Sequence, residues 1–228
     1  VAAGRDSIAY YWDLHTGTCS TISESDRHRS WIRDSNLSPD GSLLANANQA
    51  GTVLLWNLPS GEATDPRLEA TIQGHAGQVW NLAWSPDGKY LATAAADHSI
   101  KLWDIASLHG KDCYQPASGH VWDIAISGNP STIVSTHEGG TLRTWDIASR
   151  QMVSERPVPW VNNKTILALD KLHNLAAVSA VDHTSVHLVD YLTGNEILTK
   201  DLGPATVDTI ACSPDGSELA VVDESGKV

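Results

Sequence analysis

Short apolar and β-branched segments alternate with polar turns along the chain, and no stretch shows the helical spacing of apolar positions. The clearest segment is 79–105, VWNLAWSPDGKYLATAAADHSIKLWDI. It predicts a strand, an SPDG turn, a second strand, a turn containing Asp97, and a third strand ending at Trp103-Asp104. Consecutive apolar positions are typical of strands whose sheet is covered on both faces. The pattern therefore predicts an all-β chain.

The same unit recurs at a regular interval. Third strands end at Trp12-Asp13, Trp56-Asn57, Trp103-Asp104, Trp145-Asp146 and, in degenerate form, Val189-Asp190. The successive intervals are 44, 47, 42 and 44 residues. They match or lie next to the roughly 40–45 residues of a four-stranded propeller blade.

A second recurring feature is the turn SPDG, at residues 38–41, 85–88 and 213–216. Proline presets φ at its position, and glycine supplies a positive φ after aspartate, so these turns predict hairpins. Residues 127–130 and 169–172 stand in the corresponding places of the fourth and fifth units and have diverged.

Gly74-His75 and Gly119-His120, together with the Trp-Asp pairs, resemble the WD-repeat family of β-propellers, with bacterial-type repeats. The resemblance implies four-stranded antiparallel blades, about five blade-equivalents here, and a seven-bladed ring in the complete protein. We expect one domain over residues 1–228, with blades ending near 13, 57, 104, 146 and 190. Alignment of the repeats places both chain ends inside strands, so we expect a fragment of a longer protein. The alternative is a five-bladed ring closed by the first and last strands.

One unit contains His75, Thr93, Asp97 and Trp103, residue types that also occur in nucleophilic hydrolases. The resemblance assigns them a structural hydrogen-bond chain from the indole through the hydroxyl and imidazole to the carboxylate. Other units retain less of this set: Asn46 replaces the hydroxyl in the second unit. The fourth keeps His120 and Ser135 but has Gly139 in place of the aspartate. We therefore predict no catalytic residues, and a fully satisfied network only in the third unit.

The chain has 9 tryptophans and no phenylalanine. Trp31, Trp80, Trp122 and Trp160 lie before or early in first strands, where the resemblance implies a peptide-binding rim. Exposed tryptophan is typical of binding hot spots. The candidate partner-binding residues are Trp80, Asn81, Trp122 and Asp123; the alternative is that these indoles pack between blades.

Composition narrows the choice of partner. The net charge of -12 disfavours nucleic acid and anionic membrane surfaces. Three widely spaced cysteines, Cys19, Cys113 and Cys212, argue against a disulfide framework and favour a reducing, cytoplasmic location. The repeat pattern places Cys19 and Cys113 between strands, and it predicts surface loops over residues 59–67 and 107–118.

The 10 histidines lack metal-ligand spacing, apart from His183 and His187, which have no third ligand nearby. We expect no metal, cofactor or small-molecule substrate. The leading hypothesis is an interaction scaffold that binds a protein or peptide. The alternative is a regulatory or sensor propeller of a larger signalling enzyme, a Ser/Thr kinase or P-loop ATPase, although neither enzyme's motifs occur here. An enzyme built on the propeller itself would need converging acidic ligands, and no such pattern recurs.

Overall fold

A computed structural model of the chain describes residues 1–4, 6–14, 17–23, 30–59, 65–114, 119–128, 132–158, 165–170, 173–180, 184–204, 206–213 and 215–226. For residues 2, 23 and 109–114 it describes the backbone alone. Every regular element among these residues is a β-strand. The all-β prediction is confirmed.

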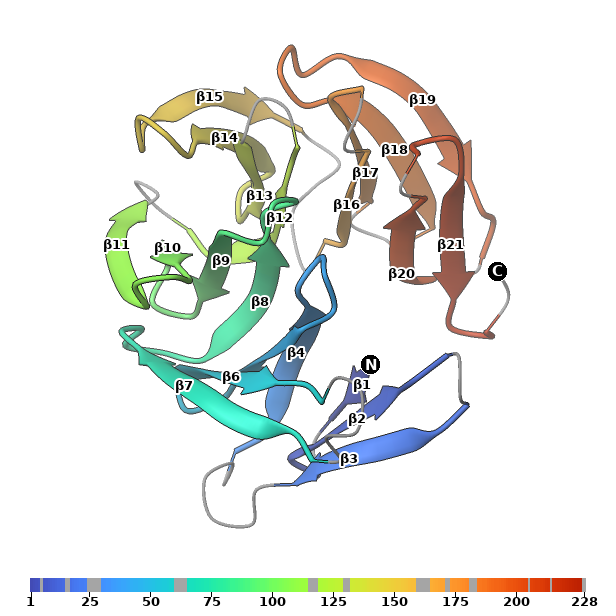
Figure 1. Ribbon diagram of the computed structural model, residues 1–228. Helices are drawn as coiled ribbons and strands as arrows, with labels where there is room; N and C mark the ends of the chain where they lie inside the picture. Colours follow the sequence, from blue (N-terminus) through green and yellow to red (C-terminus); the bar gives the residue numbers. More distant parts are fainter. Residues whose placement is uncertain are drawn as a thin grey trace. The chain divides into compact units, whose positions relative to one another are not determined.

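The chain forms two compact units, residues 1–113 and 114–228. The first unit holds three antiparallel sheets (Figure 1). Their strands are β1 (Ala2–Ala3), β2 (Ile8–Trp12) and β3 (Cys19–Ser23); then β4 (Ile32–Leu37), β5 (Leu43–Asn48), β6 (Thr52–Asn57) and β7 (Arg67–Gln73); then β8 (Val79–Trp84), β9 (Tyr90–Ala95), β10 (Ile100–Asp104) and β11 (His109–Tyr114).

The second unit also holds three sheets, the last of which has two strands. The strands are β12 (Val121–Ile126), β13 (Thr132–His137), β14 (Thr141–Asp146) and β15 (Met152–Pro157); then β16 (Leu167–Asp170), β17 (Leu175–Ser179), β18 (Ser185–Asp190) and β19 (Glu196–Asp201); then β20 (Val207–Cys212) and β21 (Leu219–Asp223).

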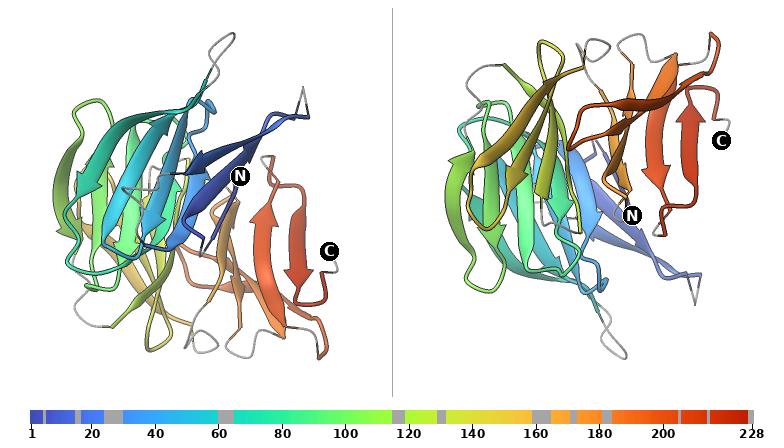
Figure 2. Two further views of the ribbon diagram at one scale, coloured as in Figure 1. Left: turned by 90° about the horizontal axis from the view of Figure 1, so that it is seen from below. Right: turned by 90° about the horizontal axis from the view of Figure 1, so that it is seen from above.

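Within each unit the sheets lie side by side, first strand next to first strand (Figure 2). In the first unit β4 lies beside β8, and in the second β12 lies beside β16 and β16 beside β20. Apolar side chains fill the space between neighbouring sheets. One such core joins Leu55 and Ile72 of the β4–β7 sheet to Leu91 and Trp103 of the β8–β11 sheet. Each sheet is therefore stabilised by its neighbour.

The outer strands of the sheets correct part of the sequence analysis. Residues 109–114 form β11, although we predicted a loop over 107–118, and Cys19 and Cys113 lie in β3 and β11 rather than between strands. Outer strands such as β15 are polar and largely exposed. They lack the apolar signal by which the buried second and third strands are recognised.

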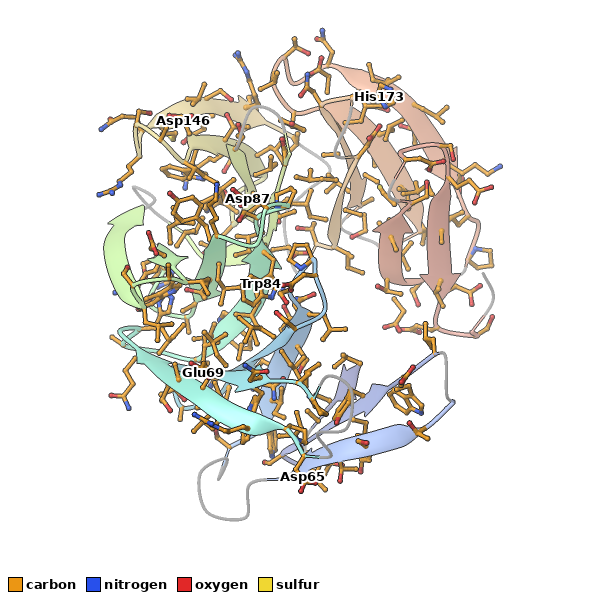
Figure 3. All side chains as sticks on the ribbon, viewed as in Figure 1. Asp65, Glu69, Trp84, Asp87, Asp146 and His173 are labelled. Carbon is orange, nitrogen blue, oxygen red and sulfur yellow. The ribbon has the colours of Figure 1, made fainter. Side chains whose placement is uncertain are left out.

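The SPDG turns adopt the predicted hairpin geometry, with positive φ at Gly41, Gly88 and Gly216. Asp87 lies in the turn after β8 (Figure 3), where its Oδ1 accepts hydrogen bonds from the Ser85 hydroxyl at 2.7 Å and the Lys89 N–H at 3.1 Å. The Ser85 hydroxyl oxygen in turn accepts from the Tyr90 N–H at 2.9 Å. The turn thus satisfies its own polar groups and fixes the register of the second strand.

Candidate protein-binding site

A β-bulge interrupts the first strand of four sheets at the same place. The ladder register shifts between Ile32 and Asp34, Val79 and Asn81, Val121 and Asp123, and Val207 and Thr209. The residues left without a ladder partner are Arg33, Trp80, Trp122 and Asp208. Bulges redirect a side chain away from the regular sheet and are common beside functional sites. Trp80 and Trp122, two of the predicted binding residues, are thus bulge residues.

In two of these four sheets, the residue after the bulge connects its sheet to the next one. One carboxylate oxygen of Asp34 accepts from the Leu82 N–H of the next sheet at 2.7 Å, and the other accepts from the Ser35 N–H at 2.8 Å. Asp123 repeats this arrangement: its oxygens accept from the N–H groups of Leu167 and Ile124, each at 2.8 Å.

The residue after the bulge, Asp34 or Asp123, therefore joins neighbouring sheets within its own unit. Burial raises the pKa of Asp34, and the hydrogen bonds from the N–H groups of Leu82 and Ser35 oppose that rise. Asp123, which we predicted as a partner contact, has a carboxylate that accepts backbone hydrogen bonds from its own and the next sheet. Asn81 occupies the equivalent place in β8.

In the first unit, the guanidinium of Arg33 lies over two indole rings. Its central carbon is 5.4 Å from the ring centroid of Trp31 and 4.9 Å from that of Trp80. One terminal nitrogen of Arg33 donates to the side-chain oxygen of Gln78 at 2.9 Å. Trp31 is 39% exposed, and Arg33 and Trp80 are half-buried. We call Trp31, Arg33 and Trp80 the arginine–indole stack.

Arg33 is a residue that the sequence analysis missed. The available signal was its position, because Arg33 follows Ile32 as Trp80 follows Val79 and Trp122 follows Val121. In the second unit, the ring of Trp122 lies 5.7 Å from that of His120. Trp122 is half-buried, and its Nε1 is enclosed with no hydrogen-bond partner among the described residues. Trp160 lies outside the described residues.

The four polar residues of the third repeat form a continuous hydrogen-bond chain. Nε1 of Trp103 donates to the Thr93 hydroxyl at 3.0 Å, and this hydroxyl lies 2.6 Å from Nε2 of His75. Nδ1 of His75 lies 3.0 Å from a carboxylate oxygen of Asp97. Because the Asp97 carboxylate only accepts hydrogen bonds, Nδ1 of His75 donates to it; Nε2 of the neutral imidazole therefore accepts the proton of the Thr93 hydroxyl.

Electrostatics support this arrangement. Burial lowers the pKa of His75, against the opposing effect of the Asp97 charge. Burial also opposes ionisation of Asp97, but hydrogen bonds from the Ser99 hydroxyl and the Ala76 N–H, together with the interaction with His75, hold the pKa of Asp97 below its ordinary value. The hydroxyl of Thr93 is fully buried among these side chains. The Thr93 hydroxyl is therefore inaccessible to a substrate, and the hydrogen-bond chain is part of the structural framework of the sheet.

The β12–β15 sheet contains a different network from the one we predicted. Nε1 of Trp145 donates to the Ser135 hydroxyl at 2.8 Å, but the imidazole 2.7 Å from that hydroxyl belongs to His137 rather than His120. The Arg143 guanidinium donates to Nδ1 of His137 at 3.2 Å and, through Nε, to Glu155 at 2.7 Å. The expectation of an incomplete network in this repeat was wrong, because His137 and Arg143 replace the missing groups.

The buried polar groups of the second repeat have fewer hydrogen-bond partners than those of the third. The Ser35 hydroxyl donates to Oδ1 of Asn46 at 2.7 Å. Nδ2 of Asn46 and Nε1 of Trp56 are buried without hydrogen-bond partners among the described residues. Both groups are donors, so the substitution of Asn46 for a hydroxyl removes the acceptor that Thr93 provides in the third repeat.

No group of three or more His, Cys, Asp or Glu side chains in the described ranges is placed to hold a metal ion. In the same part of the chain, no helix has the length and apolarity required to cross a membrane.

Comparison with known proteins identifies the repeats. The family model described as WD domain, G-beta repeat, matches residues 66–104 and 111–146. Nuclear distribution protein PAC1 of Arthroderma otae is 33% identical over 75 residues, which are 33% of this chain and 15% of that protein. Small ribosomal subunit protein RACK1 of Caenorhabditis elegans is 34% identical over 62 residues, 27% of this chain and 18% of that protein.

Structural similarity extends over more of the chain. A chain in the crystal structure of the mitotic checkpoint complex matches with a TM-score of 0.81 and 22% identity, over 98% of this chain and 68% of that one. Residues 66–104 and 111–146 thus match WD repeats, and the fold is a β-propeller of four-stranded antiparallel blades. The aligned segments make up less than a fifth of the curated relatives PAC1 and RACK1.

Proposed function

We propose that the chain is a non-catalytic scaffold that binds a protein or peptide through the bulge residues of its first strands. The arginine–indole stack is the observation that carries this proposal. Trp and Arg are, with Tyr, the residue types most enriched in binding hot spots. Here an exposed indole, a cation and a second indole are already stacked on one another. These three side chains therefore lose little conformational entropy when a partner binds.

The framework around the stack supports the same function. Each bulge residue lies outside the strand ladder, while the next residue connects sheets through Asp34 or Asp123. Contact residues and framework residues thus alternate along the first strand. We propose Trp122 as the corresponding contact in the second unit, and Asn81 and Asp123 as positioning residues for the bulges that precede them.

We also propose that the other sheets are divergent copies of the two matched repeats. The sheets ending at β7 and β19 have the same strand order and antiparallel pairing as those ending at β11 and β15. Their third strands end at Asn57 and Asp190, and β2 ends at Trp12, beside the predicted repeat end at residue 13.

Selection from a random peptide library on the immobilised chain tests the scaffold proposal. Selected peptides should bind the Arg33→Ala and Trp80→Ala variants at least tenfold more weakly than the unmodified chain. Trp12→Ala is the matched control, because Trp12 is 46% exposed but lies in a third strand without a bulge. Equal binding to all three variants would contradict the proposed site.

A further inference from the structure

Arg33 carries a charge that no carboxylate of the described residues neutralises. Its Nε is enclosed and has no hydrogen-bond partner in the same part of the chain. Arg143 provides the contrast, because its Nε donates to the Glu155 carboxylate at 2.7 Å. A charged group that has lost contact with water is stabilised by a counter-charge. Arg33 is therefore placed to gain from pairing with an added carboxylate.

The acidic residue beside Arg33 is already engaged. One oxygen of the Asp34 carboxylate accepts from the Leu82 N–H at 2.7 Å, and the other accepts from the Ser35 N–H at 2.8 Å. The group that accepts from Arg33 is the neutral amide of Gln78, 2.9 Å from one terminal nitrogen. Arg33 thus reaches from the β4–β7 sheet to a neutral acceptor beside the β8–β11 sheet.

The surrounding groups fix the plane of the Arg33 guanidinium. Its central carbon lies 5.4 Å from the centroid of the Trp31 ring and 4.9 Å from that of Trp80, and Gln78 holds one terminal nitrogen. A stacked guanidinium keeps its N–H donors in its own plane, where they match the two oxygens of a carboxylate. The second terminal nitrogen, unlike Nε, is not enclosed. It is therefore accessible to a ligand.

We propose that the arginine–indole stack binds the carboxylate of an Asp or Glu side chain in a partner peptide. This assignment rests on the proposed function and adds the chemistry that the site recognises. The carboxylate accepts hydrogen bonds from the terminal nitrogens of Arg33, and the residues next to it pack on the exposed indole of Trp31. The stack holds a single cation, which matches one carboxylate, whereas phosphorylated peptides are typically bound by clusters of arginines.

Three pools of short synthetic peptides test the proposal. The central residue is fixed as Glu, Gln or phosphoserine, and the other positions are random but exclude Asp and Glu. Each pool carries the same fluorescent label and is passed over the immobilised 228-residue chain at about 0.15 M salt, where a screening length of about 8 Å weakens repulsion by distant charges. Below saturation, the retained amount is proportional to affinity. The Glu pool should be retained about tenfold more than the Gln pool, and more than the phosphoserine pool.

Three variants, each of which makes the chain more negative by one charge, localise the binding. Arg33→Gln removes the guanidinium. Gln78→Glu keeps all three residues of the stack and gives Arg33 a carboxylate within the chain, at the place where the Gln78 oxygen now accepts. Both variants should retain the Glu and Gln pools equally. Arg67→Gln is the matched control, because Arg67 is exposed at the start of β7, and it should keep the tenfold preference.

Equal retention of the Glu and Gln pools by the unmodified chain would overturn the carboxylate assignment, as would a preference for Glu that survives Arg33→Gln. Stronger retention of the phosphoserine pool would also overturn it and would assign the site to phosphate. Equal retention of the Glu and Gln pools that Trp80→Ala abolishes would leave the proposed binding site in place and remove only its acidic ligand. Failure of the scaffold proposal and failure of the carboxylate assignment are therefore distinguishable.

Discussion

The Arg143 guanidinium donates to Nδ1 of His137 at 3.2 Å, and this contact fixes the proton of the neutral imidazole on Nε2. His75 has the reverse arrangement, because its Nδ1 faces the Asp97 carboxylate and its Nε2 accepts from Thr93. Each imidazole lies next to a hydroxyl that accepts from a tryptophan indole. Two similar networks thus contain opposite histidine tautomers.

The tautomers are directly measurable. Long-range proton–nitrogen NMR correlation spectra at neutral pH should show the proton of His75 on Nδ1 and that of His137 on Nε2. Arg143→Met should release the constraint on His137 and leave the His75 signals unchanged. The same tautomer at both positions would contradict the hydrogen-bond directions assigned here.

His137 should make stability depend on pH. Burial, followed by the Arg143 charge, lowers the pKa of His137 to about 3, whereas an unfolded histidine titrates near pH ~6.5. Between these values the unfolded chain binds a proton that the folded chain does not. The free energy of unfolding therefore falls as pH is lowered from ~6.5, by up to about 1.4 kcal/mol per pH unit for this group.

Urea unfolding of the unmodified chain and of His137→Gln at a series of pH values isolates this effect. The difference in unfolding free energy between them should shrink as pH falls from ~6.5 toward ~4, since glutamine does not titrate. The lowered pKa of His75 acts in the same direction and the raised pKa of Asp34 in the opposite one, but both are common to the two proteins. His98→Gln, at an exposed position, is the control. A constant difference across this range would contradict the prediction.

The carboxylates that connect sheets should be essential to stability. In Asp34→Asn, an amide NH₂ replaces one of the two oxygens that accept the Leu82 and Ser35 N–H groups. A donor facing a buried donor should lower the unfolding free energy by about 1–3 kcal/mol, and Asp123→Asn should behave similarly. Asp208→Asn, at an exposed bulge residue, should stay within about 0.5 kcal/mol of the unmodified chain. Equal unfolding free energies of all three variants would contradict the proposed role of Asp34 and Asp123 in joining neighbouring sheets.

Gly41 and Gly216 have similar positive φ angles but different surroundings. Alanine substitutions at the two positions therefore distinguish the cost of backbone strain from the cost of a steric clash. Gly41 and Gly216 have φ of 72° and 69° at the last position of SPDG turns. A Cβ on Gly41 meets nothing within 4 Å, whereas one on Gly216 would overlap the Asp170 carboxylate. Gly41→Ala should therefore cost about 1 kcal/mol, and Gly216→Ala about 1–3 kcal/mol more. Thermal unfolding compares the two; equal losses would show that Asp170 moves aside freely.

The features that the sequence predicts are those with local signals. The SPDG turns depend on residues adjacent in the chain, and the third strands combine buried runs with a terminal Trp-Asp. The His75 network is what the resemblance to WD-repeat proteins implies, and hydrogen bonds join its members in the expected order.

The features that escaped prediction depend on distant contacts. Leu82 is 48 residues from Asp34, so nothing near Asp34 indicates its partner. His137 lies two residues after Ser135 on the same strand, a position where the repeat has no histidine, and its effect depends on Arg143 of the next strand. Outer strands such as β15 are solvated and carry no periodic signal.

The bulges also determine how this surface is able to diversify. Arg33, Trp80, Trp122 and Asp208 have no partner residue in the strand ladder, so we expect that changing their identity leaves the strand framework intact. Substitutions at sites without shared contacts combine additively. Among these four residues, Arg33 and Trp80 are stacked, so the effects of substituting them depend on each other. A lineage of such proteins is therefore able to acquire new specificity through single, independent replacements, with no compensating changes in the core.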